Sequence, residues 1–366
     1  MTATAIPESA RMRSLALTAG VHAMNHAVYN MMTPLALTLS KFFRFDDTAS
    51  IAKGFTVYLV CYGIFQVPVG FISDKIPRKT LLSLGLIISG ISTAAVAFVP
   101  NYTVFLIGLA FSGLGAATYH PVGASYLSDL YPESKGRALG ISGFGATVGL
   151  FFGPVLGGIL CKATDWRTTF IVFAAANAAL GITFQLFAME PHREPVPAAA
   201  KSANGSGWST ELKAFLAICA AIFTLREFAG WGGYFILPMF VEKIQKVDLR
   251  YAAFIGGLQS AGGFFAQPIG GWLSDKFGRR PLMAILLFFN AIFIILIPYA
   301  GKAGIIPVVL LYSISYTATV PIIDALIADR TPSNIRGGVL GIFMATGIGI
   351  SAFSSLVLGK IIDAHK

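Results

Sequence analysis

The chain has 366 residues, of which 55% are hydrophobic and only 12% are charged. A mean hydropathy of +0.72 leaves too little polar surface to cover a water-soluble globule of this size, so the composition excludes that class and indicates a membrane protein. The formal charge of +10 would suggest a nucleic-acid partner in a soluble protein, but here the basic residues lie mostly in short loops between apolar runs. We therefore expect a lipid bilayer around the molecule and no nucleic acid.

Runs of about 20 apolar residues predict membrane-spanning helices, because a helix of that length crosses the hydrocarbon layer. Eleven such runs lie at residues 14–39, 54–73, 80–99, 102–128, 137–161, 168–189, 214–241, 251–274, 281–299, 304–328 and 337–361. The polar stretch 190–213 has the composition of a flexible linker. The prediction is an all-α polytopic membrane protein with an N-terminal lobe at 1–189 (spans 1–6), a cytoplasmic linker at 190–213, and a C-terminal lobe at 214–366 (spans 7–11).

The basic residues and the cysteines bear on localisation and on redox chemistry. Lysines and arginines are concentrated in a few tight loops on the same side of the spans as the N-terminus, and positive charge marks the cytoplasmic side. We expect a monomeric integral protein of the cell membrane with a cytoplasmic N-terminus. Cys61, Cys161 and Cys219 fall inside apolar runs without paired spacing, so we expect neither a disulfide framework nor a metal site.

The first span carries a polar stripe. His22, Asn25, His26, Tyr29 and Thr33 recur at spacings of three and four residues, which places them on one helix face. A stripe of this length is hard to explain as core packing, and histidine can change its charge near neutral pH. The stripe therefore favours substrate or proton binding, although either histidine could instead bond to a neighbouring helix.

The loop after the second span reads GFISDKIPRK and contains Gly70, Asp74, Arg78 and Lys79. Glycine lets two helices approach closely, and a carboxylate at the inner end of a span can meet an arginine or a helix N-terminus. We interpret these residues as a gating loop.

The fourth span places His120 beside Pro121 on a face of small residues. A structural histidine at a proline bend and a substrate or proton ligand are both compatible with this pattern. The segment that follows carries Asp129, Glu133 and Arg137, which are candidate partners for the basic residues of the gating loop.

The fifth span contains Gly149, Gly153 and Gly157, spaced by four residues, together with Pro154 and Gly158. Glycines at this spacing form a smooth face for a neighbouring helix, and a proline adds a bend because it removes a backbone hydrogen bond.

The seventh span carries Arg226 and Glu227, which are costly in a membrane. Adjacent residues point about 100° apart on a helix, so mutual neutralisation cannot be assumed and at least one needs a partner elsewhere. Glu227 shares its face with Trp231 and suggests a proton-accepting carboxylate. Arg226 is a candidate for an anionic substrate, and a static buried ion pair is the alternative.

The tenth span places Tyr312 and Tyr316 on one helix face and Asp324 on another. The two faces cannot both be turned toward one cavity, so Asp324 is the weaker candidate for binding and could instead contact a neighbouring span.

The two halves of the chain repeat one another. The loop after the eighth span reads GGWLSDKFGRR and aligns Gly271, Asp275, Arg279 and Arg280 with the first gating loop. A second repeated segment aligns Pro121, Asp129 and Pro132 with Pro321, Asp329 and Pro332, and Arg137 with Arg336. Two similar lobes in parallel orientation are typical of a secondary transporter.

These residues resemble the major facilitator superfamily over essentially the whole chain: the two loops are similar to its signature motif, and the glycines of the fifth span to its antiporter motif. The segments 117–125 and 225–238 look similar to its fosmidomycin-resistance-like, drug:proton antiporter branch. The resemblance implies a two-lobe bundle in which spans 1, 4, 7 and 10 line the cavity, and the candidate ionisable residues lie on those spans. It also implies that the acidic and basic loop residues pair when the inner side is shut; plain solvated charge is the alternative.

We expect a secondary active transporter, without a cofactor, that uses the proton gradient to export a small drug-like or organic-anion solute. A proton symporter importing a sugar or organic acid is the alternative within transport. The chain stops at Lys366, where the resembled fold would continue into a twelfth span, so a non-transporting sensor or assembly factor with the same fold is a further alternative. No phosphate-binding loop or nucleophile with a base is visible, so we expect no enzyme activity.

Overall fold

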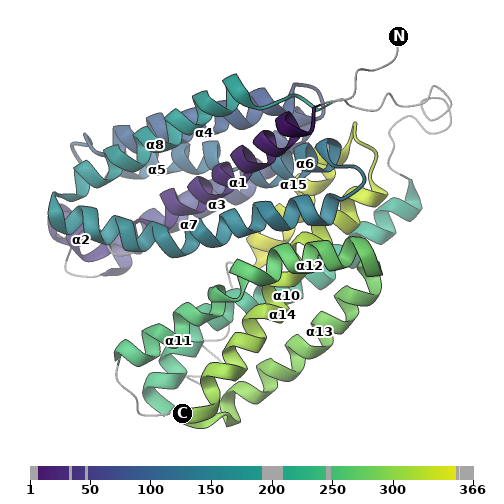
Figure 1. The fold of residues 1–366 in the computed structure, drawn as a ribbon. Coiled ribbons are helices and arrows are strands. Elements are labelled where there is room, and N and C mark those ends of the chain that lie inside the picture. The colour runs from purple at the N-terminus through teal and green to yellow at the C-terminus, as the bar shows by residue number, and fades with distance from the viewer. Residues whose placement is uncertain are drawn as a thin grey trace. The chain divides into compact units, whose positions relative to one another are not determined.

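The computed structural model describes residues 7–32, 35–45, 48–191, 209–244 and 249–351, together with residue 354. All regular secondary structure within these ranges is helical (Figure 1). Seven of the described helices are long and apolar enough to cross a membrane, judged by length and composition. The expected all-α membrane fold is thereby confirmed.

The helices form two compact units. Among the described residues, unit 1 is made of those within Met1–Glu133, Ile141–Pro195 and Ser333–Ile342. Unit 2 is made of those within Ser134–Gly140, Val196–Pro332 and Phe343–Lys366. Two helices, α7 (Lys135–Ala163) and α15 (Arg336–Ser351), are therefore divided between the units, at Gly140/Ile141 and at Ile342/Phe343. The lobe boundaries expected from the sequence follow chain order and stay a prediction.

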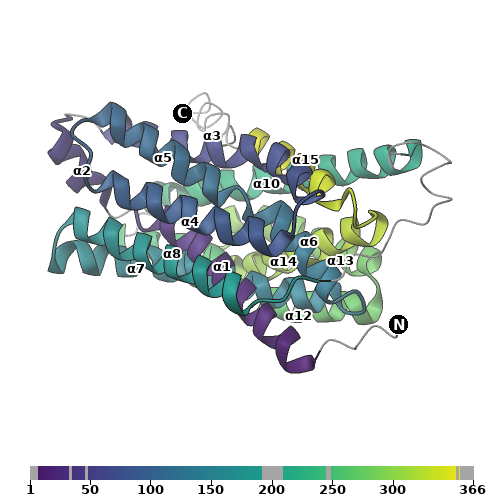
Figure 2. The same cartoon turned by 90° about the horizontal axis from the view of Figure 1, so that it is seen from above.

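Unit 1 contains the first helices of the chain: α1 (Glu8–Asn30), α2 (Ala36–Phe43), α3 (Thr48–Ser73), α4 (Arg78–Val96), α5 (Tyr102–Ala116), η2 (Tyr119–Gly123), α6 (Ala124–Leu130) and α8 (Trp166–Phe187). The helix α4 lies beside α5 and α8, and α3 packs on α5 (Figure 2). Glycines permit this closeness: a Cβ at Gly90 of α4 would lie 2.9 Å from the carbonyl oxygen of Ala174 on α8.

Unit 2 contains the later helices: α10 (Thr210–Ile244), α11 (Leu249–Ala261), α12 (Gly263–Phe277), α13 (Arg279–Leu296), η3 (Ile297–Tyr299) and α14 (Gly301–Arg330). The helix α14 is the centre of this unit, since α10, α11, α12 and α13 all contact it. On α13 the side chains of Ile285, Phe288 and Ile295 are exposed, as expected for a helix that faces lipid.

Three predicted spans are interrupted, which the hydropathy pattern did not reveal. The span expected at 14–39 is two helices, α1 and α2, and the sequence places Pro34 between them, a residue type that removes one helical hydrogen bond. The span expected at 251–274 breaks at Gly262, whose amide donates to the Ser313 hydroxyl at 2.9 Å. The span expected at 102–128 contains η2, a π-helical segment around Pro121.

Candidate functional site

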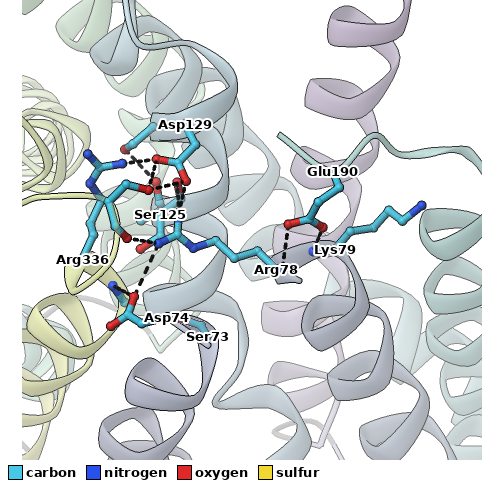
Figure 3. Close-up of polar contacts among 12 residues, drawn as sticks. Ser73, Asp74, Arg78, Lys79, Ser125, Asp129, Glu190 and Arg336 are labelled. Atoms are coloured by element: carbon cyan, nitrogen blue, oxygen red, sulfur yellow. Dashed lines mark hydrogen bonds and ion pairs between the residues drawn. The ribbon is translucent and has the colours of Figure 1, made fainter. Parts of the chain in front are cut away.

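The signature loop of unit 1 surrounds a buried arginine. Arg78 is fully buried and pairs with Asp129, whose carboxylate also pairs with Arg336 (Figure 3). The same guanidinium donates to the carbonyl oxygen of Ser333 at 2.6 Å and lies 3.4 Å from Asp74. A buried guanidinium with two carboxylates and a carbonyl around it is compensated, whereas an unpaired one would be strongly destabilising.

Asp74 caps the start of α15. Its carboxylate oxygens accept from the amides of Gly337 and Gly338, both at 2.9 Å, so it satisfies donors that have no partner inside the helix. A side chain at Gly70 would collide with the Gly337 carbonyl, so glycine is required for this approach. Burial raises the pKa of the Asp74 carboxyl above its ordinary value, and the two amides and Arg78 oppose that shift.

Unit 2 repeats this arrangement with its own residues. The Asp275 carboxylate accepts from the amides of Gly136 at 3.0 Å and Arg137 at 2.7 Å, and therefore caps α7. A side chain at Gly271 would collide with the Gly136 carbonyl. The sequence repeat thus corresponds to a repeated structural device, an aspartate and a glycine at the first turn of a helix.

Two basic residues, Arg279 and Lys135, pair with carboxylates at the second signature loop in unit 2. Arg279 lies 2.7 Å from Asp275 and 2.6 Å from Asp329, and Lys135 lies 2.9 Å from Asp329. The Arg279 side chain is 13% exposed, whereas the Arg78 side chain is 0% exposed. The second network is therefore the more solvated one.

Other predicted gate residues take different roles. Glu133 pairs with Arg11, whose guanidinium also lies over the Tyr131 ring. Burial alone would raise the pKa of the Glu133 carboxyl, but the Arg11 guanidinium holds this pKa below its ordinary value. Arg137 takes part through its backbone amide. For Lys79 and Arg280, the described residues show no side-chain hydrogen bond or ion pair.

Glu190 was not predicted to be functional, yet it caps α4. Its carboxylate accepts from the amides of Arg78 at 2.9 Å and Lys79 at 2.8 Å (Figure 3). Pro77 precedes this helix and offers no side-chain cap. Because Glu190 lies at the first position of the predicted linker, only its position in space identified it.

A cluster of three imidazoles occupies unit 1. The ring centroid of His22 lies 5.0 Å from that of His26 and 5.3 Å from that of His120, and the last two are 5.8 Å apart. His22 and His26 come from adjacent turns of α1, and the π-helical segment η2 carries His120. Segments of π-helix are frequent at functional sites.

Tyrosines that the sequence reasoning missed extend this cluster. The rings of Tyr58 and Tyr62 of α3 stack with their centroids 6.3 Å apart. The ring centroid of Tyr29 lies 5.0 Å from that of Tyr58, and the ring centroid of Tyr62 lies 5.9 Å from that of His120. The hydroxyls of Tyr58 and Tyr62 are buried without a hydrogen-bond partner among the described residues. Their spacing of four residues places Tyr58 and Tyr62 on one helix face, and this pattern in the sequence could have identified them.

Asn25 has a packing role. Its amide donates at 2.7 Å to the carbonyl oxygen of Ala116, in the last turn of α5, where helical hydrogen bonds end. It therefore ties α1 to the element that leads into His120. Thr33, the last residue of the predicted stripe, lies outside the described residues.

The glycines of the fifth span pack on α1. A Cβ at Gly149 would collide with the carbonyl of Ala23, and a Cβ at Gly153 would lie 2.9 Å from the Cα of Ala27. At Gly157 it would lie 2.7 Å from the carbonyl of Met31. These glycines hold the helix that carries His22 and His26. Gly158 is less buried than Gly157, and the side chain of Pro154 lies outside the described part.

A buried ion pair occupies unit 2. Arg226 and Glu227 are 6% and 8% exposed and pair with each other, since the long arginine side chain spans the angle between adjacent positions. Arg226 also donates to the Thr319 hydroxyl at 2.6 Å and to the Tyr316 carbonyl at 2.7 Å. The partner on another span that the sequence required is therefore α14.

Tyr316 completes this site. Its ring lies 3.8 Å from the Arg226 guanidinium and its hydroxyl donates to Glu227 at 3.2 Å. The ring of Tyr312 stacks on it at 5.7 Å. Asp324 is buried, and its Oδ1 has no hydrogen-bond donor among the described residues. The Trp231 side chain lies outside them.

The sequence matches the family described as the Major Facilitator Superfamily over residues 15–356. The chain belongs to this superfamily. The expected family is confirmed, whereas no comparison tests its assignment to the drug:proton antiporter branch.

Relatives and solved structures of this superfamily cover most of the chain. The MFS-type transporter YcxA of Bacillus subtilis is 26% identical over 316 residues, which is 81% of this chain and 75% of YcxA. The structure of the transporter FucP from E. coli in an outward conformation covers 97% of this chain and 93% of its own, with a TM-score of 0.75 and 16% identity. The human organic anion transporter MFSD10 covers 96% of this chain and 93% of its own, with a TM-score of 0.74 and 14% identity. The chain is thus a membrane transporter of the superfamily fold.

Within this superfamily chain, the predicted site residues form four groups. Two are the charged networks centred on Arg78 and Arg279, and two are polar clusters in the apolar helices, the imidazole cluster of unit 1 and the Arg226–Glu227 pair of unit 2. The charged networks suit a conformational element, and the polar clusters suit binding.

Proposed function

We propose that the chain is a proton-coupled secondary transporter of a small organic anion, in which Glu227 accepts the proton and Arg226 binds the anion. The observation that carries this proposal is the buried ion pair of Arg226 and Glu227, which lies inside an apolar helix bundle. A charged pair inside an apolar helix bundle is expensive to maintain, so such residues generally mark a substrate or proton pathway.

Protonation would neutralise the Glu227 carboxylate and leave the positive charge of Arg226 without its partner. The guanidinium stays in place, because its other N–H groups are held by the Thr319 hydroxyl and the Tyr316 carbonyl. A carboxylate of the solute can then take the position of the Glu227 carboxylate, with the planar geometry that arginine offers to such groups. Proton and anion therefore bind together.

Joint binding favours the symport of an organic acid over the export mode that the antiporter motif suggested. An antiporter requires proton and solute to compete for the site, whereas here the proton prepares the site for the solute. The glycines of that motif are accounted for by close packing on α1. Export by exchange is the outcome of the test that would contradict joint binding.

The two charged networks supply the conformational element of the proposal. Each consists of helix-capping and ion-pair contacts that can form in one state and break in another. A carrier needs such a bistable element, because solute binding can shift an equilibrium only if the two states differ in contacts.

Glu227→Gln is expected to separate solute binding from proton coupling. Glutamine resembles the protonated acid, so the variant in proteoliposomes should still exchange labelled for unlabelled organic acid. It should, however, lose accumulation driven by an acidic outer medium. A panel of mono- and dicarboxylates first identifies the solute, and Glu211→Gln, an exposed glutamate of the same helix, is the matched control.

Accumulation by Glu227→Gln at the wild-type level would contradict the proton role, as would wild-type flux that a protonophore leaves unchanged. Wild-type accumulation driven by an acidic interior would show exchange instead of symport.

The double variant Arg226→Gln, Glu227→Gln is expected to lose anion exchange that Glu227→Gln retains. It removes both charges of the ion pair, so neither partner is left buried without the other and folding should be preserved. We expect the apparent affinity for the anion to fall at least about 100-fold, the range for loss of a buried charge-assisted contact. Arg330→Gln, at the end of α14, is the control, and retained anion exchange by the double variant would rule out Arg226 as the anion site.

A further inference from the structure

The imidazole cluster places three metal-ligand atoms together. One ring nitrogen from each of His22, His26 and His120 lies within 4.8 Å of the others. Three imidazoles bound at about 2.0–2.1 Å to one tetrahedral ion have nitrogens about 3.4 Å apart. Binding would therefore require the rings to close by roughly 1 to 1.5 Å through side-chain rotations.

The hydrogen bonding of His22 prepares it as a ligand. Its Nδ1 lies 2.9 Å from the backbone carbonyl oxygen of Ser142, which can only accept, so Nδ1 carries the proton and Nε2 presents its lone pair. His22 is 7% exposed, and its Nε2 has no partner among the described residues. A histidine held by a carbonyl at one nitrogen, with a free lone pair at the other, is the usual arrangement of a metal ligand.

The position of the third histidine depends on the π-helical segment. His120 follows Tyr119, whose ring stacks on His22 at 4.0 Å and whose hydroxyl bonds to Ser142. The contacts of Tyr119 and Ser142 thus fix His22 and orient the segment that carries His120. Aromatic packing alone would not require three ring nitrogens to converge.

We propose that His22, His26 and His120 bind one divalent first-row transition-metal ion, with Zn²⁺ as the probe. Imidazole ligands suit zinc, copper, nickel and iron, whereas magnesium and calcium require oxygen ligands. Three neutral ligands leave the charge of the ion uncompensated and one coordination position open, for water or for an anionic group of a solute. This site is independent of the proposed role of Arg226 and Glu227, and it would stand if that role failed.

Zinc titration of the purified full chain tests the proposal. The protein, carrying a histidine-free affinity tag and treated with a chelator, is titrated calorimetrically in lipid nanodiscs. We expect one Zn²⁺ per chain, and binding at least tenfold weaker in His26→Gln and His120→Gln. His192→Gln, a histidine outside the described residues, is the control and should bind as the wild type does. Equal affinity in all four proteins would overturn the proposal.

X-ray absorption of the zinc-loaded wild type provides a measurement that needs no variant. Three imidazole ligands with nitrogens at about 2.0–2.1 Å are expected. A shell of oxygen alone, or one containing a sulfur from a cysteine, would place the ion elsewhere and overturn the assignment. A stoichiometry of zero would overturn it too. Because neither measurement uses transport, failure here is distinguishable from failure of the proposed function.

Discussion

Replacing Arg78 by alanine is expected to lower the free energy of unfolding by about 3 kcal/mol. The guanidinium is fully buried and is bonded to Asp129 and to the Ser333 carbonyl. Breaking a buried ion pair typically costs about 3 to 5 kcal/mol, and Asp129 keeps Arg336 as a partner, so the lower end of that range applies. The shift in the thermal unfolding midpoint of detergent-purified protein measures the effect.

Two neighbouring substitutions calibrate this result. Lys79→Ala alters an adjacent basic residue that has no ion pair among the described residues, and it should change stability by no more than about 0.5 kcal/mol. Arg279→Ala removes the counterpart of Arg78 in unit 2, where the side chain is 13% exposed, and should have an intermediate effect. If Arg78→Ala unfolds at the same temperature as Lys79→Ala, the buried network does not stabilise the unit.

Gly149→Ala is expected to destabilise the chain by about 2 kcal/mol, within the range for overpacking. A methyl group at this position collides with the backbone carbonyl of Ala23, which cannot rotate away as a side chain could. The helices α1 and α7 must then separate, and α1 carries His22 and His26. Thermal unfolding measures the loss, and the apparent Zn²⁺ affinity should fall with it.

Gly63→Ala is the matched control for this substitution. Gly63 lies in α3, and a Cβ there meets no atom of the described residues within 4 Å. Alanine is the better helix former by about 1 kcal/mol, so this variant should be as stable as the wild type or slightly more stable. A Gly149→Ala variant of unchanged stability but reversed coupling would contradict the packing role and support the antiporter interpretation of the motif.

The candidate site shows where sequence reasoning succeeds and where it stops. The repeat predicted that Asp74 and Asp275 would serve equivalent roles, and both cap the first turn of a helix. The sequence could not identify their partners, since Gly337 and Gly136 are distant from them along the chain. Glu190 was missed for the same reason, because a helix cap supplied from far away leaves no local signal.

Helix continuity was the weakest part of the sequence reasoning. Hydropathy measures the average over a span, so it does not register a break at Gly262 or a π-helical segment at Pro121. The equivalent Pro321 lies inside the continuous helix α14. A proline removes one backbone hydrogen bond in either case, and the surrounding packing selects the response.

The sequence by itself determined that this protein is a helical membrane transporter of the Major Facilitator Superfamily, because composition, span length and a repeated motif are local properties of the chain. Only the tertiary structure decided which polar groups meet. It paired Arg226 with Glu227 and surrounded Arg78 with carboxylates. It also brought His120 to the two histidines of α1. The physical reason is that a buried charge or imidazole is satisfied by whichever group the packing of other helices places beside it, and that placement depends on contacts between distant segments.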